Sequence, residues 1–145
     1  MTYKEYTKAR QDEYNNLPIK YAFGYDQFYK ILKEEGWKEN DVVSIGYGGY
    51  MQRKDLPKLK EFTENDKINE LMKDYDFAYE AIFYEMGNHE YHINWEGDYD
   101  VMSCFGNLIW IDNDPADYFQ QLDWEPQTIK AYLDARKAFL KTAQY

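Results

Sequence analysis

The stretch from Tyr75 to Met86, YDFAYEAIFYEM, constrains the fold more than any other part of the chain. Its aromatic and aliphatic residues recur at helical spacing and cover most of the circumference of a helix. A helix that is apolar on most sides has to be covered by other elements. We therefore expect this segment to be the central helix of the fold, ending at about Gly87 or Tyr91.

Other helices are predicted where a capping residue or a proline precedes a helical stripe of apolar residues. They run from Thr2 to Asn16, from Asp26 to Gly36, from Asp55 onward, from Asp114 to Leu122 and from Glu125 onward. Gly46, Gly48 and Gly49 interrupt two strand-like runs, which predicts a hairpin or a sharply bent strand, with the glycines in a turn. We expect residues 94–100 to form a loop, whereas residues 101–105 and 108–111 fit either a helix or a strand.

The predicted fold class is a mostly helical α+β domain. Helices pack around the central aromatic-rich helix, and a small glycine-rich β element has two or three strands. At 145 residues the chain is expected to be a single domain, residues 1–145. Sixteen tyrosines bring the aromatic content to 19%. Rings are therefore expected to fill much of the core, many with the hydroxyl in water.

Charge is distributed unevenly along the sequence. Residues 1–60 carry a net charge of +2, whereas residues 61–145 carry −12. Between Asp74 and Ile129 there are 13 carboxylates and no lysine or arginine. Such a surface repels nucleic-acid phosphates and attracts basic partners. We expect no direct nucleic-acid binding, and with no long apolar run and no apolar leader we expect no membrane span and a cytoplasmic protein.

Both histidines, His89 and His92, lie in one acidic stretch. On a continuing helix they would share a face, with nearby carboxylates as potential oxygen ligands: Glu85, Glu90, Asp98 and Asp100. The spacing is not that of HExxH, and no cysteine stands near enough in sequence to suggest a zinc frame. No metal and no cofactor are expected. Cys104 is expected to be a small buried apolar residue, although a pair with His89 stays open.

Three segments together resemble an uncharacterised family of small proteins from bacterial mobile elements and their phages. They are YAFGYDQF (21–28), SIGYGGYMQRKDLPKL (44–59) and FYEMGNHEY (83–91). The resemblance extends over about residues 1–100. It implies a protein of the bacterial host cytoplasm and no particular reaction. His92 stands where the family pattern has glycine, which directs attention to Asn88, His89 and Glu90 as a unit.

NHEY has two interpretations. As a structural cap, Asn88 or His89 would bond the last free carbonyls of the central helix, and Tyr91 would pack back on the core. As a site, His89, Glu90 and Asn88 would be catalytic candidates. They would belong to a small hydrolase or a ligand- or metal-binding protein, with the site near the GYGG segment. The cap is the favoured interpretation.

The leading functional hypothesis is a non-enzymatic binding protein that contacts a basic protein surface by mimicking nucleic acid. The resemblance extends this to inhibition of a host nucleic-acid-guided defence nuclease, as anti-CRISPR proteins do. The residues expected to meet the partner are acidic or aromatic: Glu96, Asp98, Asp100, Asp112, Asp114, Trp95 and Tyr99.

Overall fold

The computed structural model describes residues 1–93, 95–111 and 115–142, apart from the side chain of Trp95. The chain divides into two compact units. One comprises Met1–Thr7 with Lys67–Tyr145 and is called the acidic unit below; the other comprises Lys8–Asp66 and is called the hairpin unit. The expectation of one domain stays a prediction.

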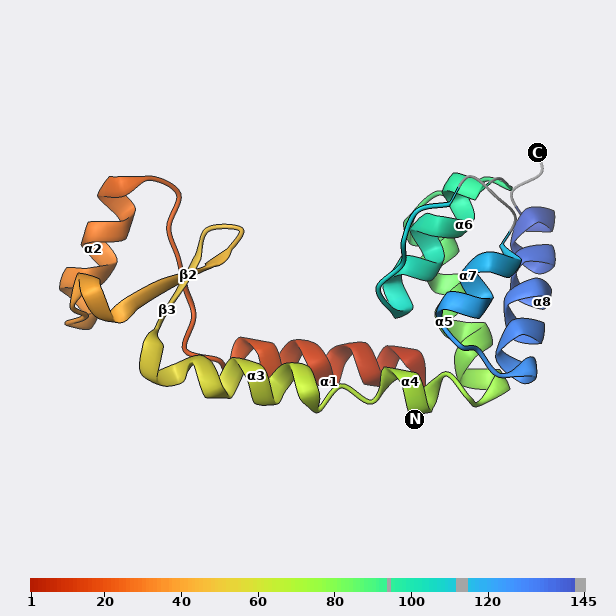
Figure 1. Ribbon diagram of the computed structural model, residues 1–145, viewed down its shortest axis with the longest axis horizontal. Helices are drawn as coiled ribbons and strands as arrows, with labels where there is room; N and C mark the ends of the chain where they lie inside the picture. The colour runs from red at the N-terminus through yellow and green to blue at the C-terminus, as the bar shows by residue number, and fades with distance from the viewer. Residues whose placement is uncertain (94, 112–114, 143–145) are drawn as a thin grey trace. The chain divides into compact units, whose positions relative to one another are not determined.

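The hairpin unit contains most of α1 (Tyr3–Asn15), α2 (Tyr25–Glu35), α3 (Leu56–Glu64) and a three-stranded antiparallel sheet (Figure 1). The strands β1 (Lys20–Tyr21), β2 (Val42–Gly46) and β3 (Gly49–Gln52) lie in the order β1-β3-β2. Short 3-10 turns at Glu39–Asp41 and Arg53–Asp55 flank the hairpin. The guanidinium of Arg10 lies 3.7 Å from the ring centre of Phe62 and donates to its carbonyl, which ties α1 to α3.

The GYGG segment is the turn of the β2–β3 hairpin. Tyr47 and Gly48 occupy its two central positions with φ of 53° and 80°. Positive φ at both positions is the pattern of the type I′ turn, whose twist matches that of paired strands. A side chain at Gly48 would also collide with the ring of Phe23. The predicted turn role of these glycines is confirmed.

The acidic unit is helical. After α4 (Ile68–Leu71) the chain forms α5 (Tyr75–Asn88), α6 (Trp95–Met102), a 3-10 turn (Ser103–Phe105), α7 (Ala116–Gln121) and α8 (Pro126–Thr142) (Figure 1). Asp74 caps α5 by accepting from the N–H of Phe77 at 2.9 Å. Together with the small sheet, these elements confirm the predicted mostly helical α+β class.

The core of the acidic unit lies where α5 packs against α8. Both helices present alanine there, namely Ala78 and Ala81 on α5 and Ala131 and Ala135 on α8, and all four are completely buried. Small side chains let two helices approach closely, and larger rings then fill the space around them. The prediction that α5 is the central aromatic-rich helix is therefore confirmed for this unit. No helix within the described residues is long and apolar enough to cross a membrane.

Asp98 lies inside this core, and the predicted loop at residues 94–100 is wrong. Residues from Trp95 onward form α6, and Asp98 is only 2% exposed. Its carboxylate accepts hydrogen bonds from the hydroxyls of Tyr91, at 2.7 Å, and Tyr132, and it lies 4.0 Å from the guanidinium of Arg136. A buried carboxylate is tolerated when its lone pairs are satisfied in this way. Asp98 therefore joins α6 to α8 and is not available to a partner.

The network around Asp98 makes stability sensitive to alkali. Burial, and then the charge of Asp98, raise the pKa of Tyr91 and of Tyr132 above the ordinary value of a tyrosine. Above about pH 10 the unfolded chain loses these two protons first, so the free energy of unfolding falls as the pH rises. We expect a slope of about 1.4 kcal/mol per pH unit for each proton, measured by urea unfolding at several alkaline pH values. Tyr132→Phe should reduce the slope by the contribution of one proton. An unchanged slope in this variant would contradict the assignment of the slope to Tyr132.

Candidate functional site

The segment GNHEY ends α5 in a Schellman motif. His89 is the C-cap, and Glu90 adopts the left-handed conformation with φ of 50°. The N–H of Tyr91 donates to the carbonyl of Met86 at 2.9 Å, and that of Glu90 donates to the carbonyl of Gly87 at 3.4 Å. Tyr91 is buried and packs against Phe139, so its predicted return to the core is confirmed. The last carbonyls are bonded by the backbone of Glu90 and Tyr91, not by the side chains of Asn88 or His89 as expected.

Glu90 occupies the position of this motif that favours glycine. We therefore expect Glu90→Gly to raise the free energy of unfolding by roughly 0.5–1 kcal/mol, because relief of left-handed strain outweighs the added chain entropy. Chemical denaturation measures the change. Glu96→Gly is the matched control, since Glu96 is exposed within α6, and it should lower stability by about 1 kcal/mol. If Glu90→Gly destabilised the protein, the assignment of Glu90 to the left-handed position of the Schellman motif would be wrong.

The same helix end brings together three groups with chemistry. Glu85 and His89 lie one turn apart on α5, and Cys104 reaches them from the 3-10 turn after α6. Nε2 of His89 lies 3.3 Å from Oε2 of Glu85 and 3.3 Å from Sγ of Cys104, and the sulfur lies 3.4 Å from the same Oε2. We call these residues the Glu-His-Cys triad. The pair of Cys104 with His89 that the sequence left open is therefore present, although the two residues are not close enough in sequence to suggest a zinc site.

Glu85 is held in place within the triad. It is buried, and its Oε1 accepts a hydrogen bond from the hydroxyl of Tyr3 at 2.8 Å. Nδ2 of Asn88 lies 3.5 Å from Oε2. Asn88 thus belongs to the surroundings of the triad. The sequence placed Glu85 among several possible oxygen ligands, and its spacing of four residues from His89 is the signal that singles it out.

Cys104 differs from the expected buried apolar residue. The residue is exposed, and its sulfur faces Glu85 and His89. Burial of the sulfur and the negative charge of Glu85 raise the pKa of the thiol to about 12. A thiol in this state is a poor nucleophile at neutral pH, because the thiolate is the reactive form. The geometry also differs from a nucleophile triad, since Glu85 and Cys104 approach the same ring nitrogen.

His89 also borders an open pocket of about 170 Å³. The pocket is lined by His89, Glu90, His92, Glu96, Gly97 and Asp100. His89 is therefore accessible, with 38% of its side chain exposed. Glu90 lines the same pocket, so the structure brings it together with His89. The glycine segment is not among the lining residues and belongs to the hairpin unit.

The residues expected to meet a partner fall into three groups. Glu96 is exposed, and Asp100 and Tyr99 are half-buried. The ring of Tyr99 packs on Trp110 and Tyr118, with centroids 4.9 and 5.8 Å apart. Asp98 is buried, as described above. Asp112, Asp114 and the side chain of Trp95 lie outside the described residues.

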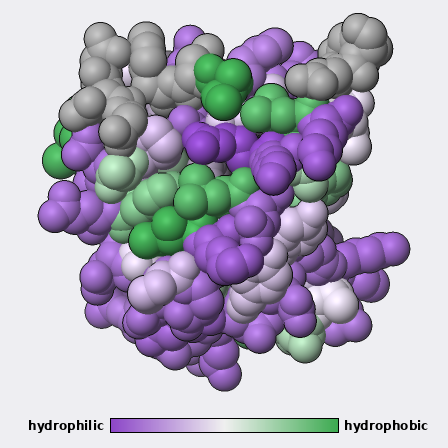
Figure 2. Space-filling model, turned by 90° about the vertical axis from the view of Figure 1, so that its right-hand side faces the viewer, coloured by the Kyte–Doolittle hydropathy of each residue, from purple (hydrophilic) through white to green (hydrophobic). Residues whose placement is uncertain are grey.

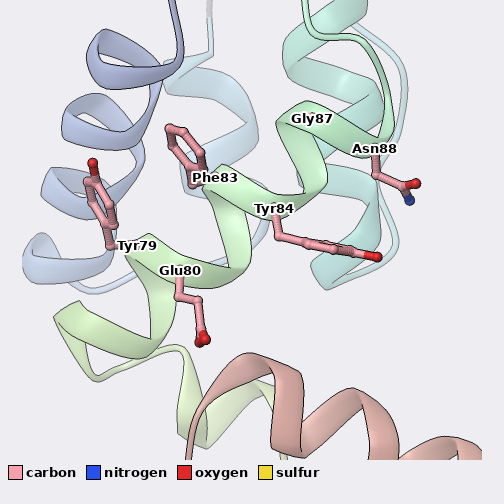
Figure 3. A pocket seen from close by; sticks show the side chains of 6 residues that line it. All are labelled: Tyr79, Glu80, Phe83, Tyr84, Gly87 and Asn88. Atoms are coloured by element: carbon pink, nitrogen blue, oxygen red, sulfur yellow. The ribbon is translucent and has the colours of Figure 1, made fainter. Parts of the chain in front are cut away.

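A second concave surface lies along α5 and was not predicted from the sequence. It is a groove of about 610 Å³ lined by Tyr79, Glu80, Phe83, Tyr84, Gly87 and Asn88 (Figure 3). Tyr84 and Asn88 point to one side of the helix, whereas Tyr79 and Phe83 point toward α8. Tyr84 is 58% exposed. The signal for this surface was the apolar circumference of α5, which continues beyond the face that α8 covers.

Comparison with known proteins gives one relationship. The model of a family described as "Family of unknown function (DUF7659)" matches residues 2–137. The chain belongs to this family. The family match spans both units, including GYGG and GNHEY. No curated protein and no solved structure matches the chain.

Proposed function

We propose that this member of the family is a non-enzymatic binding protein whose acidic unit takes up a positively charged segment of a partner protein. The observation that carries the proposal is an open apolar groove on α5 in a unit whose net charge is strongly negative. Both features serve binding and neither requires a reaction.

The net negative charge of the chain comes almost entirely from the acidic unit. This unit has 7 Lys/Arg and 16 Asp/Glu, a net charge of −9, whereas the hairpin unit has 10 and 11, a net charge of −1. Segment 74–129, which contains all of α5, α6 and α7, has no lysine or arginine. A field of one sign raises the rate of association with an oppositely charged partner and fixes its orientation.

The groove adds an apolar, aromatic contact surface to the negative charge of the unit. Tyr79, Phe83 and Tyr84 give it aromatic walls, and Glu80 adds a carboxylate. Aromatic side chains in a cleft are the groups that most often dominate the energy of a protein interface. Figure 2 shows one face of the acidic unit, where a band of hydrophobic side chains lies exposed among hydrophilic ones. The complementary occupant is an amphipathic segment with apolar residues on one side and lysine or arginine on the other.

We further propose that the partner is a nucleic-acid-binding protein. Carboxylates on a rigid frame can pair with the lysines and arginines that would otherwise contact phosphates. The resemblance to mobile-element and phage proteins extends the proposal to the bacterial host cytoplasm and a nucleic-acid-guided defence nuclease as the partner. Glu96 and Asp100 remain surface carboxylates for this role, and Asp98 does not.

Titration with a synthetic helical peptide that carries leucine on one face and lysine and arginine on the other tests the groove directly. We expect saturable binding that weakens as salt rises, since the charges on the peptide are screened. Tyr84→Ala should reduce affinity by about 30-fold, the effect of losing one hot-spot side chain. Tyr25→Ala is the matched control, because Tyr25 is an exposed helical tyrosine of the hairpin unit, and it should leave affinity unchanged.

A pulldown from the bacterial host then tests the class of partner. We expect a basic nucleic-acid-binding protein that is retained at low salt and displaced by added duplex DNA or guide RNA. Retention should fall in Tyr84→Ala and in the double variant Glu96→Gln/Asp100→Asn. The proposal fails if the peptide does not bind, if Tyr84→Ala and Tyr25→Ala behave alike, or if nucleic acid does not compete.

A ligand- or metal-binding protein or small hydrolase is the second candidate function. The observation that favours it is the approach of Cys104 and Glu85 to His89 at the border of a pocket. Its site is then the Glu-His-Cys triad, with Asn88 and Glu90 beside it. The GYGG segment forms the turn of a hairpin in the other unit and is not among the residues that line this pocket.

A further inference from the structure

We propose that Glu85, His89 and Cys104 bind a single zinc ion through Oε2, Nε2 and Sγ, leaving its fourth position to water. This inference does not depend on the binding function proposed above. It departs from the expectation of no metal, which rested on the spacing of residues in the sequence.

The distances within the triad match those of a zinc site. In four-coordinate zinc sites the ligand atoms lie roughly 2.0–2.3 Å from the ion, so that at tetrahedral angles neighbouring ligand atoms are roughly 3.3–3.6 Å apart. The three separations in the triad are 3.3, 3.3 and 3.4 Å. One nitrogen, one oxygen and one sulfur atom therefore already form one face of a tetrahedron. A mixed set of thiolate, imidazole and carboxylate suits zinc better than magnesium or calcium, which prefer oxygen alone.

The support around the ligands is also that of a metal site. The hydroxyl of Tyr3 bonds Oε1 of Glu85 at 2.8 Å, which turns Oε2 toward His89 and Cys104. Such contacts from outside the ligand set commonly orient metal-binding carboxylates. His89 is fixed by its place as C-cap of α5, and Cys104 by the turn after α6. Three ligands are thus presented by elements that the core already holds in position.

The number of ligands distinguishes the class of site. Structural zinc sites close with four protein ligands, whereas sites that keep a water have three. Within the described residues, the triad is the cluster of His, Cys, Asp and Glu whose ligand atoms converge on a point. His89 and Cys104 are exposed, so that water can reach the ion from the solvent side. Binding displaces the thiol proton of Cys104 to solvent, and no oxidation or reduction takes place.

Metal titration of protein purified without a histidine tag and stripped with a chelator tests the site. Cobalt(II) is added first, because its bond to a thiolate produces a charge-transfer absorption in the near ultraviolet. We expect saturation at one equivalent, and displacement of cobalt by zinc with loss of the absorption. Cys104→Ser should abolish the absorption, and His89→Ala and Glu85→Gln should each weaken cobalt binding by at least about tenfold.

Two further variants distinguish metal binding at the triad from nonspecific metal binding elsewhere on the protein. His92→Ala removes the other histidine of the same pocket and should leave binding unchanged. Tyr3→Phe should weaken binding by about 10- to 100-fold, because Glu85 loses the hydroxyl that orients it. Circular dichroism confirms that each variant folds, and exposed Cys104 is the substitution least able to disturb the core. The proposal is overturned if the wild-type protein shows no saturable binding, or if the absorption survives in Cys104→Ser. It is also overturned if His92→Ala weakens cobalt binding as much as His89→Ala does.

Discussion

Asp98→Ala is expected to destabilise the acidic unit by on the order of 3–5 kcal/mol. The substitution removes the acceptor shared by the hydroxyls of Tyr91 and Tyr132, and it leaves Arg136 without its buried counter-charge. Buried donors that lose their partner cost the full price of their desolvation, and a cavity adds to it. Chemical denaturation followed by circular dichroism measures the loss.

Glu96→Ala is the control for Asp98→Ala. Glu96 lies in the same helix, carries the same charge and is exposed, so its removal should change stability by less than about 0.5 kcal/mol. A double-mutant cycle sharpens the assignment. Asp98→Ala should cost less in a Tyr132→Phe background than in the wild-type protein, because one of the bonds is already missing. Equal costs in both backgrounds would show that the carboxylate is not held by Tyr132.

Short sequence patterns correctly predicted those turns and helix ends that are stabilised by residues nearby in the sequence. The glycines of the hairpin and Gly36 at the end of α2 act through residues only a few positions away. Thr2 is a further case: its hydroxyl accepts from the N–H of Glu5, whose carboxylate accepts from the N–H of Thr2. The fold class followed from these elements together with the circumference of α5.

The loop predicted at residues 94–100 failed because its decisive contacts are distant. A glycine and three acids in six residues are typical of a loop, and the groups that satisfy Asp98 include Tyr132 and Arg136, more than thirty residues later. A weaker signal existed. Asp98, Val101, Met102 and Phe105 follow the spacing of one helical face. A helix predicted from this spacing would place the carboxylate of Asp98 on its buried face.

The triad escaped prediction for a similar reason. His89 and Cys104 are fifteen positions apart, and the Schellman turn followed by α6 brings the sulfur back to the end of α5. Sequence spacing finds metal ligands that lie on one helix or one short loop, and it misses those joined by a reversal of the chain. The pair Glu85 and His89 was visible at i and i+4. Cys104 was considered as a possible partner of His89, but not together with Glu85 as a metal ligand.

Gly97→Ala is expected to destabilise α6 by roughly 1–3 kcal/mol, although alanine is the better helix former. Gly97 is buried in the first turns of α6, and a Cβ at this position would overlap the backbone carbonyl of His92. A carbonyl cannot rotate away as a side chain can. The backbone that follows the Schellman turn would therefore have to move, together with the pocket that His89 and His92 line.

Gly87→Ala tests whether this cost comes from the contact and not from losing a glycine. Gly87 lies within α5, and a Cβ there would meet only the ring of Phe139 at an ordinary 3.8 Å. We expect this variant to gain roughly 0.5–1 kcal/mol, since alanine loses less backbone entropy in a helix. Thermal and urea unfolding of both variants should thus give opposite signs. If Gly97→Ala were as stable as the wild type, the close approach of α6 to His92 would be wrong, and with it the shape of the pocket beside the triad.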